Sequence, residues 1–167
     1  MRQFSFITIL LILFTCTLSS QNLTLENELN IFSFKTEKGK IVSLSIEKDS
    51  LYIVYRFGTE EKVELEFPEK NKQSWKKFKF NGYNRGGGKE NAGMEIYNVM
   101  FENNGFKYVL FTSYHAEDDS NEIGIHVINL KSNKDVRIKG EIETQNGSLY
   151  EFKYTNLLEF DDFGLFD

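Results

Sequence analysis

The sequence predicts an all-β fold, a single antiparallel β-sandwich or barrel of about nine or ten strands. From residue 31 onward, apolar and polar residues alternate with the period of two that is typical of half-buried strands. The links between these segments are short, and Asn-Gly pairs at Asn104 and Asn146 favour tight hairpin turns. No long segment shows the period of an amphipathic helix.

The predicted strands follow one another closely along the chain. Segments 94–102 and 106–114 are apolar on both faces, which predicts a central position in the sheet. The remaining predicted strands cover residues 31–37, 40–47, 51–57, 62–67, 75–80, 123–130, 135–143 and 148–154. A short helical turn is predicted only for 23–30, where two leucines are spaced by about one turn. The acidic, aromatic tail from 157 to 167 is expected to pack on the sheet.

The first twenty residues have the layout of a secretory signal peptide. Arg2 precedes an apolar run from Phe4 to Phe14, and small polar residues follow up to Ser20. The apolar run is too short to span a bilayer. We therefore expect residues 1–20 to be removed and residues 21–167 to form one exported domain, periplasmic or secreted, without a transmembrane span.

A lipid anchor at Cys16 is the alternative to soluble export. The stretch from Leu13 to Cys16 resembles a bacterial lipoprotein signal, although Thr15 stands where Gly, Ala or Ser is usual. Lipidation would tether the chain to the envelope. Cleavage at the soluble site would instead remove the only cysteine, so the mature chain would have no disulfide.

The charge balance bears on the class of partner. The chain has 20 basic and 25 acidic residues, a net charge of −5. Proteins that bind nucleic acids are expected to carry a basic footprint, so we expect no nucleic-acid partner. An acidic chain is suited instead to attracting cationic partners.

The most distinctive segment is GYNRGGGKENAGM, residues 82–94. It does not match a phosphate-binding loop, because Gly88-Lys89 is followed by Glu90 where Ser or Thr is required. The glycines either allow a sharp bend or bulge at a sheet edge, or leave backbone N–H groups open to a partner's carboxylate. For the second reading, the candidate contact residues are Tyr83, Arg85, Gly86, Gly87, Gly88, Lys89 and Asn91.

Catalytic motifs are not found. Only His115 and His126 could serve as imidazole bases, and the chain has no GxSxG, no HExxH and no cysteine pair. Carboxylate pairs are numerous, but none is singled out by its spacing. We therefore expect a protein that is not an enzyme and needs no cofactor.

The acidic loop 115–122 raises the question of a metal site. Its weak candidates are Asp118, Asp119 and Asn121. The calcium-loop template would place Ile123 at a ligand position, and an isoleucine side chain has no donor atom. A solvated hairpin loop without a metal is the favoured interpretation.

Between Tyr83 and Gly140 the chain resembles a group of small exported bacterial proteins, mostly uncharacterised. The shared features are a GGG-x-x-NAG segment, here 86–93, and an F-x-x-x-G-x-x-Y hairpin, here 101–108. The resemblance implies a periplasmic or envelope-facing β-domain and assigns no reaction. At the level of fold alone, the chain is similar to periplasmic lysozyme inhibitors and immunity proteins, which block a partner with an inserted loop.

These features predict an exported, non-enzymatic binding module of inhibitor or immunity type, acting on a protein or cell-wall component of the envelope. Two alternatives stay open. One is an enzyme or binder that acts on cell-wall glycans through carboxylates and aromatic residues along a groove. The other is a structural envelope lipoprotein.

Overall fold

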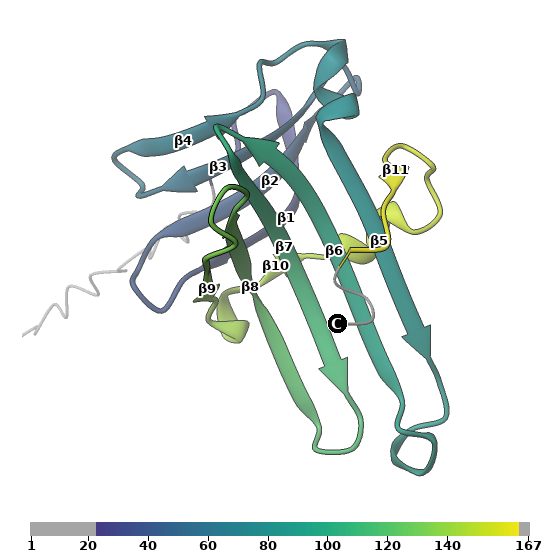
Figure 1. Cartoon of the computed structure of the whole chain (residues 1–167). Coiled ribbons are helices and arrows are strands. Elements are labelled where there is room, and N and C mark those ends of the chain that lie inside the picture. Colours follow the sequence, from purple (N-terminus) through teal and green to yellow (C-terminus); the bar gives the residue numbers. More distant parts are fainter. Residues whose placement is uncertain (1–22, 164–167) are drawn as a thin grey trace, which may run out of the picture.

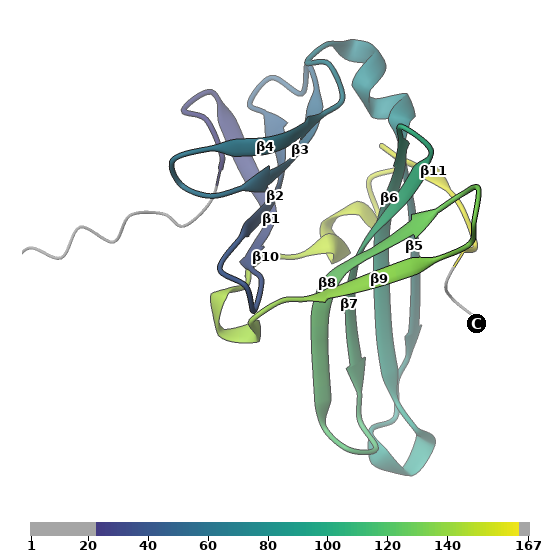
Figure 2. The ribbon, with the colours of Figure 1, turned by 60° about the vertical axis from the view of Figure 1, so that its left-hand side comes forward.

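The computed structural model describes residues 23–163, which form two β-sheets packed face to face (Figures 1 and 2). The strand order is β10-β1-β2-β3-β4 in one sheet and β11-β5-β6-β7-β8-β9 in the other. The all-β prediction is confirmed, in its sandwich form. Within 23–163 no helix is long and apolar enough to cross a membrane. The predictions for the signal peptide and Cys16 lie outside the described residues.

The five-stranded sheet is built from consecutive antiparallel strands. Its members are β1 (Glu28–Lys35), β2 (Ile41–Glu47), β3 (Ile53–Gly58) and β4 (Val63–Phe67), joined on the β1 side by the two-residue β10 (Asn146–Gly147). The second Asn-Gly pair therefore does not form the hairpin turn that its sequence predicts. It pairs with Phe32 and Ser33 of β1, because the chain returns there from the other sheet.

The six-stranded sheet contains the longest strands. They are β5 (Phe78–Arg85), β6 (Met94–Asn103), β7 (Phe106–His115), β8 (Ser120–Asn129) and β9 (Asp135–Lys139), followed by the parallel two-residue β11 (Glu159–Phe160) beside β5. β6 and β7 lie at the centre of this sheet, as their two-sided apolar pattern predicts. Asn104 and Gly105, with φ of 50° and 80°, make the predicted tight turn between them.

Aromatic side chains join the two sheets. Phe101 of β6 is 2% exposed, and its ring centroid lies 4.9 Å from that of Tyr55 and 4.7 Å from that of Phe67, both on the five-stranded sheet. It also contacts Phe78 and Tyr108 of its own sheet, at 5.3 and 4.8 Å. Phe101 is therefore a central contact of the core.

The two sheets differ in extent. In Figures 1 and 2 the five-stranded sheet covers only one end of β5–β8, and the other end extends well beyond it. We call the part of these strands beyond the core residues Tyr97 and Ile123, residues 83–96 and 113–122, the projecting end. Its two turns, 86–93 and 116–119, lie farthest from the five-stranded sheet.

Three short segments differ from their predicted structure. The predicted strand 135–143 ends at Lys139, and its last two residues lie in a 3₁₀-helix. Residues 148–154 are not a strand, because Leu149–Phe152 forms the 3₁₀-helix η4. Leu149 and Phe152 are three residues apart and both buried, which suits the three-residue turn of such a helix. In 75–80, the first residues belong instead to the 3₁₀-helix η1 (Lys72–Lys77), and β5 begins at Phe78.

The chain from 23 to 30 is also not helical. After a turn it enters β1 at Glu28, whose carboxylate accepts a hydrogen bond from the Leu25 N–H at 2.9 Å. Glu28 is 5% exposed because it pairs with Arg56 of β3. The leucines that suggested a helical face, Leu25 and Leu29, are instead both exposed.

The C-terminal tail packs on the six-stranded sheet as predicted, as far as residue 163. The Asn81 amide donates to the carbonyl oxygens of Asp161 and Phe163, both at 2.6 Å. Lys79 Nζ lies 3.0 Å from the Asp161 carboxylate. These contacts fix β11 beside β5.

A buried ionic network holds the start of β1 to β3. Arg56 is 1% exposed and donates to both Glu28 carboxylate oxygens, at 2.6 and 2.7 Å. Its Nε donates to Glu66 at 2.7 Å, and the Tyr52 hydroxyl donates to Glu28 at 2.9 Å. Every charge in the network has a partner, which buried ions require.

This network should make the free energy of unfolding depend on pH in the acidic range. Burial raises the pKa of Glu28 and of Glu66, but hydrogen bonds and charge from Arg56 outweigh it, so both pKa values are lowered. A carboxylate with a lowered folded pKa stabilises the fold above its ordinary pKa of 4.5, and this contribution is lost as pH falls through the folded value.

We therefore expect the free energy of unfolding in denaturant titrations to fall as pH drops below about 4.5. In Glu66→Gln the fall should be shallower. The control is Glu64→Gln, in the same strand, because Glu64 pairs with the exposed Lys40. If the free energy of unfolding fell equally steeply with pH in both variants, the acid dependence would not come from the pairing of Glu66 with Arg56.

Candidate functional site

The glycine-rich segment forms the turn between β5 and β6 at the tip of the projecting end. The turn contains the 3₁₀-helix η2 (Lys89–Asn91) and two glycines with positive φ, Gly87 at 99° and Gly88 at 60°. A Cβ atom on Gly87 would lie 2.7 Å from the Asn91 Cβ. Both the backbone angle and the space therefore require glycine at position 87.

Side chains predicted to contact a partner also close this turn. Arg85 donates from Nε to the Ala92 carbonyl at 2.8 Å, and from Nη2 to the same oxygen. The Asn91 amide donates to the Gly86 carbonyl at 2.9 Å, and the Gly93 N–H donates to the Gly88 carbonyl at 2.8 Å. The turn therefore has a defined internal hydrogen-bond network.

The outer surface of the turn is backbone. Residues 86–90 are exposed, and within the described part of the chain the N–H groups of Gly87 and Gly88 donate no hydrogen bond. Lys89 adds an exposed cation. Tyr83 and Arg85 alternate with Asn84 along β5, so they face away from the five-stranded sheet. The structure thus brings the seven predicted contact residues together on one hairpin.

The acidic turn between β7 and β8 lies beside the glycine turn. The Ala116 N–H donates to the Gly93 carbonyl at 2.8 Å. Asp118 accepts from the Ser120 N–H, and Asp119 accepts from the Tyr114 hydroxyl, each at 3.2 Å. Among residues 23–163 no group of three or more His, Cys, Asp or Glu side chains is placed to hold a metal ion.

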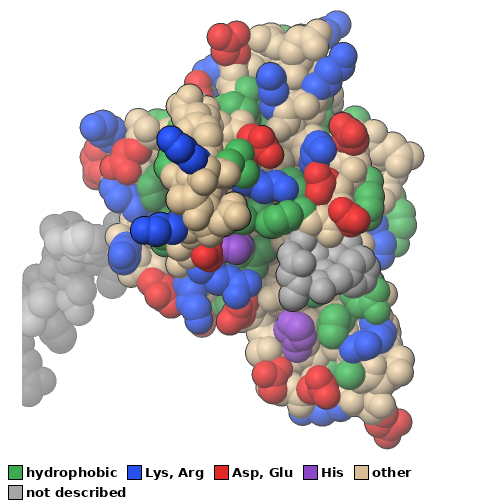
Figure 3. Space-filling model, viewed as in Figure 1, with side chains coloured by type: hydrophobic (Ala, Val, Ile, Leu, Met, Phe, Trp, Pro, Cys, Tyr) green, Lys and Arg blue, Asp and Glu red, His purple; other side chains and the backbone are tan. Residues whose placement is uncertain are grey.

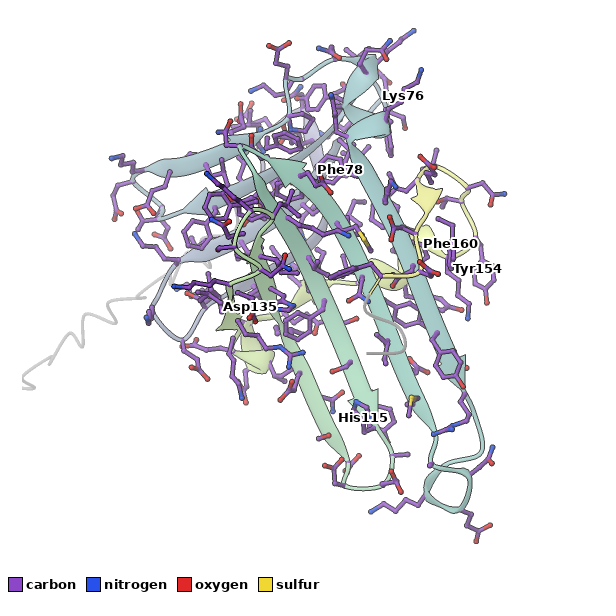
Figure 4. The ribbon with its side chains drawn as sticks, in the orientation of Figure 1. Lys76, Phe78, His115, Asp135, Tyr154 and Phe160 are labelled. Carbon is purple, nitrogen blue, oxygen red and sulfur yellow. The ribbon has the colours of Figure 1, made fainter. Side chains whose placement is uncertain are left out.

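The outer face of the six-stranded sheet has a mixed charge. Figure 3 shows acidic and basic side chains interspersed over this face. His115 lies near the end of β7 (Figure 4), whereas His126 is paired with Asp135 at 2.7 Å. The two histidines thus lie in separate environments.

A groove lies on the inner face of the projecting end, which is the face that continues the core side of the six-stranded sheet. Side chains on this face change in character along the strands. The row Phe80, Val99, Leu110 and Ile125 is apolar and buried in the core. Two rows nearer the tip are largely polar, and they consist of Gly82, Tyr97, Thr112 and Ile123, then Asn84, Glu95, Tyr114 and Asn121.

The far wall of the groove comes from the segment between β9 and β11. This segment contains the 3₁₀-helix η3 (Ile142–Thr144) and η4, and Figure 4 shows Tyr154 on the loop after η4. The groove has a volume of about 470 Å³. We call it the tyrosine groove; it is lined by Asn84, Glu95, Tyr97, Thr112, Ser113, Tyr114, Asn121, Glu122, Ile123, Ile142, Gln145, Ser148, Tyr150, Lys153 and Tyr154.

Three tyrosines surround one lysine in this groove. Lys153 Nζ lies 5.9, 5.4 and 5.5 Å from the ring centroids of Tyr97, Tyr150 and Tyr154. The Tyr150 hydroxyl donates to that of Tyr154 at 3.2 Å, and this bond with partial desolvation raises the pKa of Tyr150 to about 12. Tyr150 is therefore a neutral phenol at physiological pH.

Tyr97 lies on the groove floor with its hydroxyl group buried. It is 4% exposed, and its hydroxyl oxygen is buried without a hydrogen-bond partner in residues 23–163. Gly82 lies directly opposite it on β5, and a Cβ there would come within 2.7 Å of the Tyr97 ring. Glycine at position 82 thus leaves space for the ring.

Sequence reasoning did not find the tyrosine groove. Its residues come from β5–β8 and from residues 142–154, beyond β9, so no local motif contains them. One signal was available: in four successive strands, the inward positions change from apolar to polar toward the same end.

Comparison with protein-family models, with curated proteins and with solved structures finds no match for this chain.

Proposed function

We propose that this protein is an exported, non-enzymatic binding module that holds a protein of the cell envelope with the glycine turn of its projecting end. The observation that carries the proposal is the form of this turn. It is exposed, closed by its own hydrogen bonds, and placed beyond the second sheet, where a partner has access.

The chemistry of the turn favours a carboxylate on the partner. The N–H groups of Gly87 and Gly88 are adjacent, exposed and donate no hydrogen bond within residues 23–163, so a carboxylate of the partner can accept from them. Lys89 adds a positive charge beside the negative charge of Glu90, and the two hydrogen bonds of Arg85 within the turn use Nε and Nη2 and leave Nη1 for a partner. Because the turn is already ordered, binding loses little conformational entropy.

Capture from envelope extract tests the proposal. The bait is the chain from Gln21, compared with Gly87→Val and Arg85→Ala. We expect the parent to retain a protein that both variants lose. Gly87→Val clashes with Asn91, and Arg85→Ala removes two bonds that close the turn.

The control is Gly39→Val, because Gly39 also has positive φ, at 73°, but lies in the β1–β2 turn with open space around its Cβ. It should retain the partner. Circular dichroism must show that all baits are folded. Association with the purified partner should slow as salt is raised. Folded loop variants that capture the same proteins as the parent would overturn the proposal.

A further inference from the structure

We propose that the tyrosine groove is a carbohydrate-binding site that takes a short, uncharged oligosaccharide. This inference goes beyond the proposed function, because both the site and the ligand class differ. The groove and the glycine turn's Tyr83 and Arg85 lie on opposite faces of the six-stranded sheet.

The lining of the groove suits a ligand with alternating polar edges and C–H faces. Four tyrosine rings line it, and an aromatic ring offers a negative face to C–H groups. Between the rings stand amides, hydroxyls and carboxylates, which bind sugar hydroxyls as donors and acceptors. Asn84 Nδ2 donates to Glu95 at 2.9 Å, so this carboxylate is already oriented on the floor.

Other ligand classes fit this lining less well. Among residues 23–163, Ile123 and Ile142 are the only aliphatic side chains that line the groove, too few for an acyl chain. In the described part of the chain, the groove lining has one cation, Lys153, and two carboxylates, Glu95 and Glu122, and this excess of negative charge disfavours a phosphate or another anion. The volume of about 470 Å³ lies within the range of small-molecule sites.

The Tyr97 hydroxyl gives independent support for a ligand. A buried hydroxyl without a partner destabilises the folded protein, so native structures rarely keep one without a reason. The other two such atoms in residues 23–163 belong to Asn30 and Ser43, which do not line the groove. Because this oxygen is buried, a sugar hydroxyl would supply the missing partner after neighbouring side chains of the groove move aside.

The test begins with the folded chain from Gln21 on an array of defined oligosaccharides that includes β-1,4-linked N-acetylglucosamine tetramers. The oligosaccharide bound most tightly is then titrated by calorimetry. Tyr114→Ala and Tyr150→Ala should each weaken binding about five- to tenfold, the effect of one lost aromatic contact. Phe106→Ala is the control, because Phe106 is 37% exposed, like Tyr150 at 39%, but lies at the opposite end of β7.

Tyr97→Phe separates a ligand-binding role from a structural one. It should weaken oligosaccharide binding about three- to tenfold while leaving the melting temperature equal or higher, because it removes an unsatisfied hydroxyl. Binding that is absent from the array, or unchanged in folded Tyr114→Ala and Tyr150→Ala, would overturn the inference. A lower melting temperature of Tyr97→Phe with unchanged affinity would overturn the role of its hydroxyl.

The two sites are distinguished by testing the variants of each site in the binding assay of the other. Gly87→Val and Arg85→Ala should bind the oligosaccharide with the affinity of the parent. Tyr150→Ala should still capture the envelope protein. Loss of oligosaccharide binding in the loop variants would show that the groove is not the separate site inferred here.

Discussion

Arg56→Ala should lower the free energy of unfolding by about 3–5 kcal/mol, because it leaves the buried Glu28 carboxylate without its cation. Arg56 makes three charge-assisted hydrogen bonds to Glu28 and Glu66 and one to the Leu23 carbonyl. Urea titration of the folded chain measures the loss. The loss should be large because Arg56 is 1% exposed and the Glu28 carboxylate that it leaves unpaired is 5% exposed.

A double variant shows whether the loss comes from the unpaired charge. Arg56→Met combined with Glu28→Leu removes both ions and keeps apolar volume, so it should be considerably more stable than Arg56→Ala. Arg137→Ala is the surface control, because Arg137 lies 3.9 Å from Glu122 with both side chains about half exposed. It should change stability by less than about 1 kcal/mol. A similarly small loss for Arg56→Ala would refute the network's role.

Phe101→Ala should lower the free energy of unfolding by a similar amount, about 3–5 kcal/mol. The substitution leaves a cavity at the point where aromatic rings from both sheets meet. Tyr55 and Phe67 contact Phe101 from one sheet, and Phe78 and Tyr108 contact it from the other. These rings are held by their strands and can fill the space only in part.

The same urea titration serves for Phe101→Ala. Its control is Phe106→Ala, five residues further along the chain, where the ring is 37% exposed and lies outside the core cluster. That change should cost less than about 1 kcal/mol. If the two variants lost equal stability, Phe101 would not be the contact that joins the sheets.

Strands were predictable where burial is regular. Segments 94–102 and 106–114 were placed at the centre of a sheet because they are apolar on both faces, and β6 and β7 lie there. The turn at Asn104 was predictable because its conformation is local to two residues. The projecting position of the glycine turn was not, since it depends on how far the other sheet extends.

Predictions failed where tertiary contacts override local pattern. Residues 148–154 have the aromatic content of a strand, but Leu149 and Phe152 both reach the core from a 3₁₀-helix. At 23–30, the ion pair between Glu28 and Arg56 stabilises strand entry over a helical turn. No local sequence pattern identifies Glu28 and Arg56 as partners, because they are far apart along the chain.

The two candidate binding sites also differ in how far the sequence predicts them. All seven candidate contact residues of the β5–β6 hairpin come from one contiguous segment, so they could be named from the sequence. The tyrosine groove could not, because Tyr97 and Tyr150 meet only once strand register and the path of the returning chain are fixed. Contiguous sites are accessible to sequence reasoning, whereas sites assembled from distant segments require the fold.

The unequal extent of the two sheets has a consequence for how such a protein can diversify. The core around Phe101 lies where both sheets overlap, the glycine turn lies outside that region, and the tyrosine groove shares Tyr97 and Ile123 with the core. Substitutions at exposed positions of the glycine turn therefore act mainly on recognition, and those in the overlap act mainly on folding. A lineage of such chains could exchange partners or ligands by changing a few tip residues while its core stayed the same.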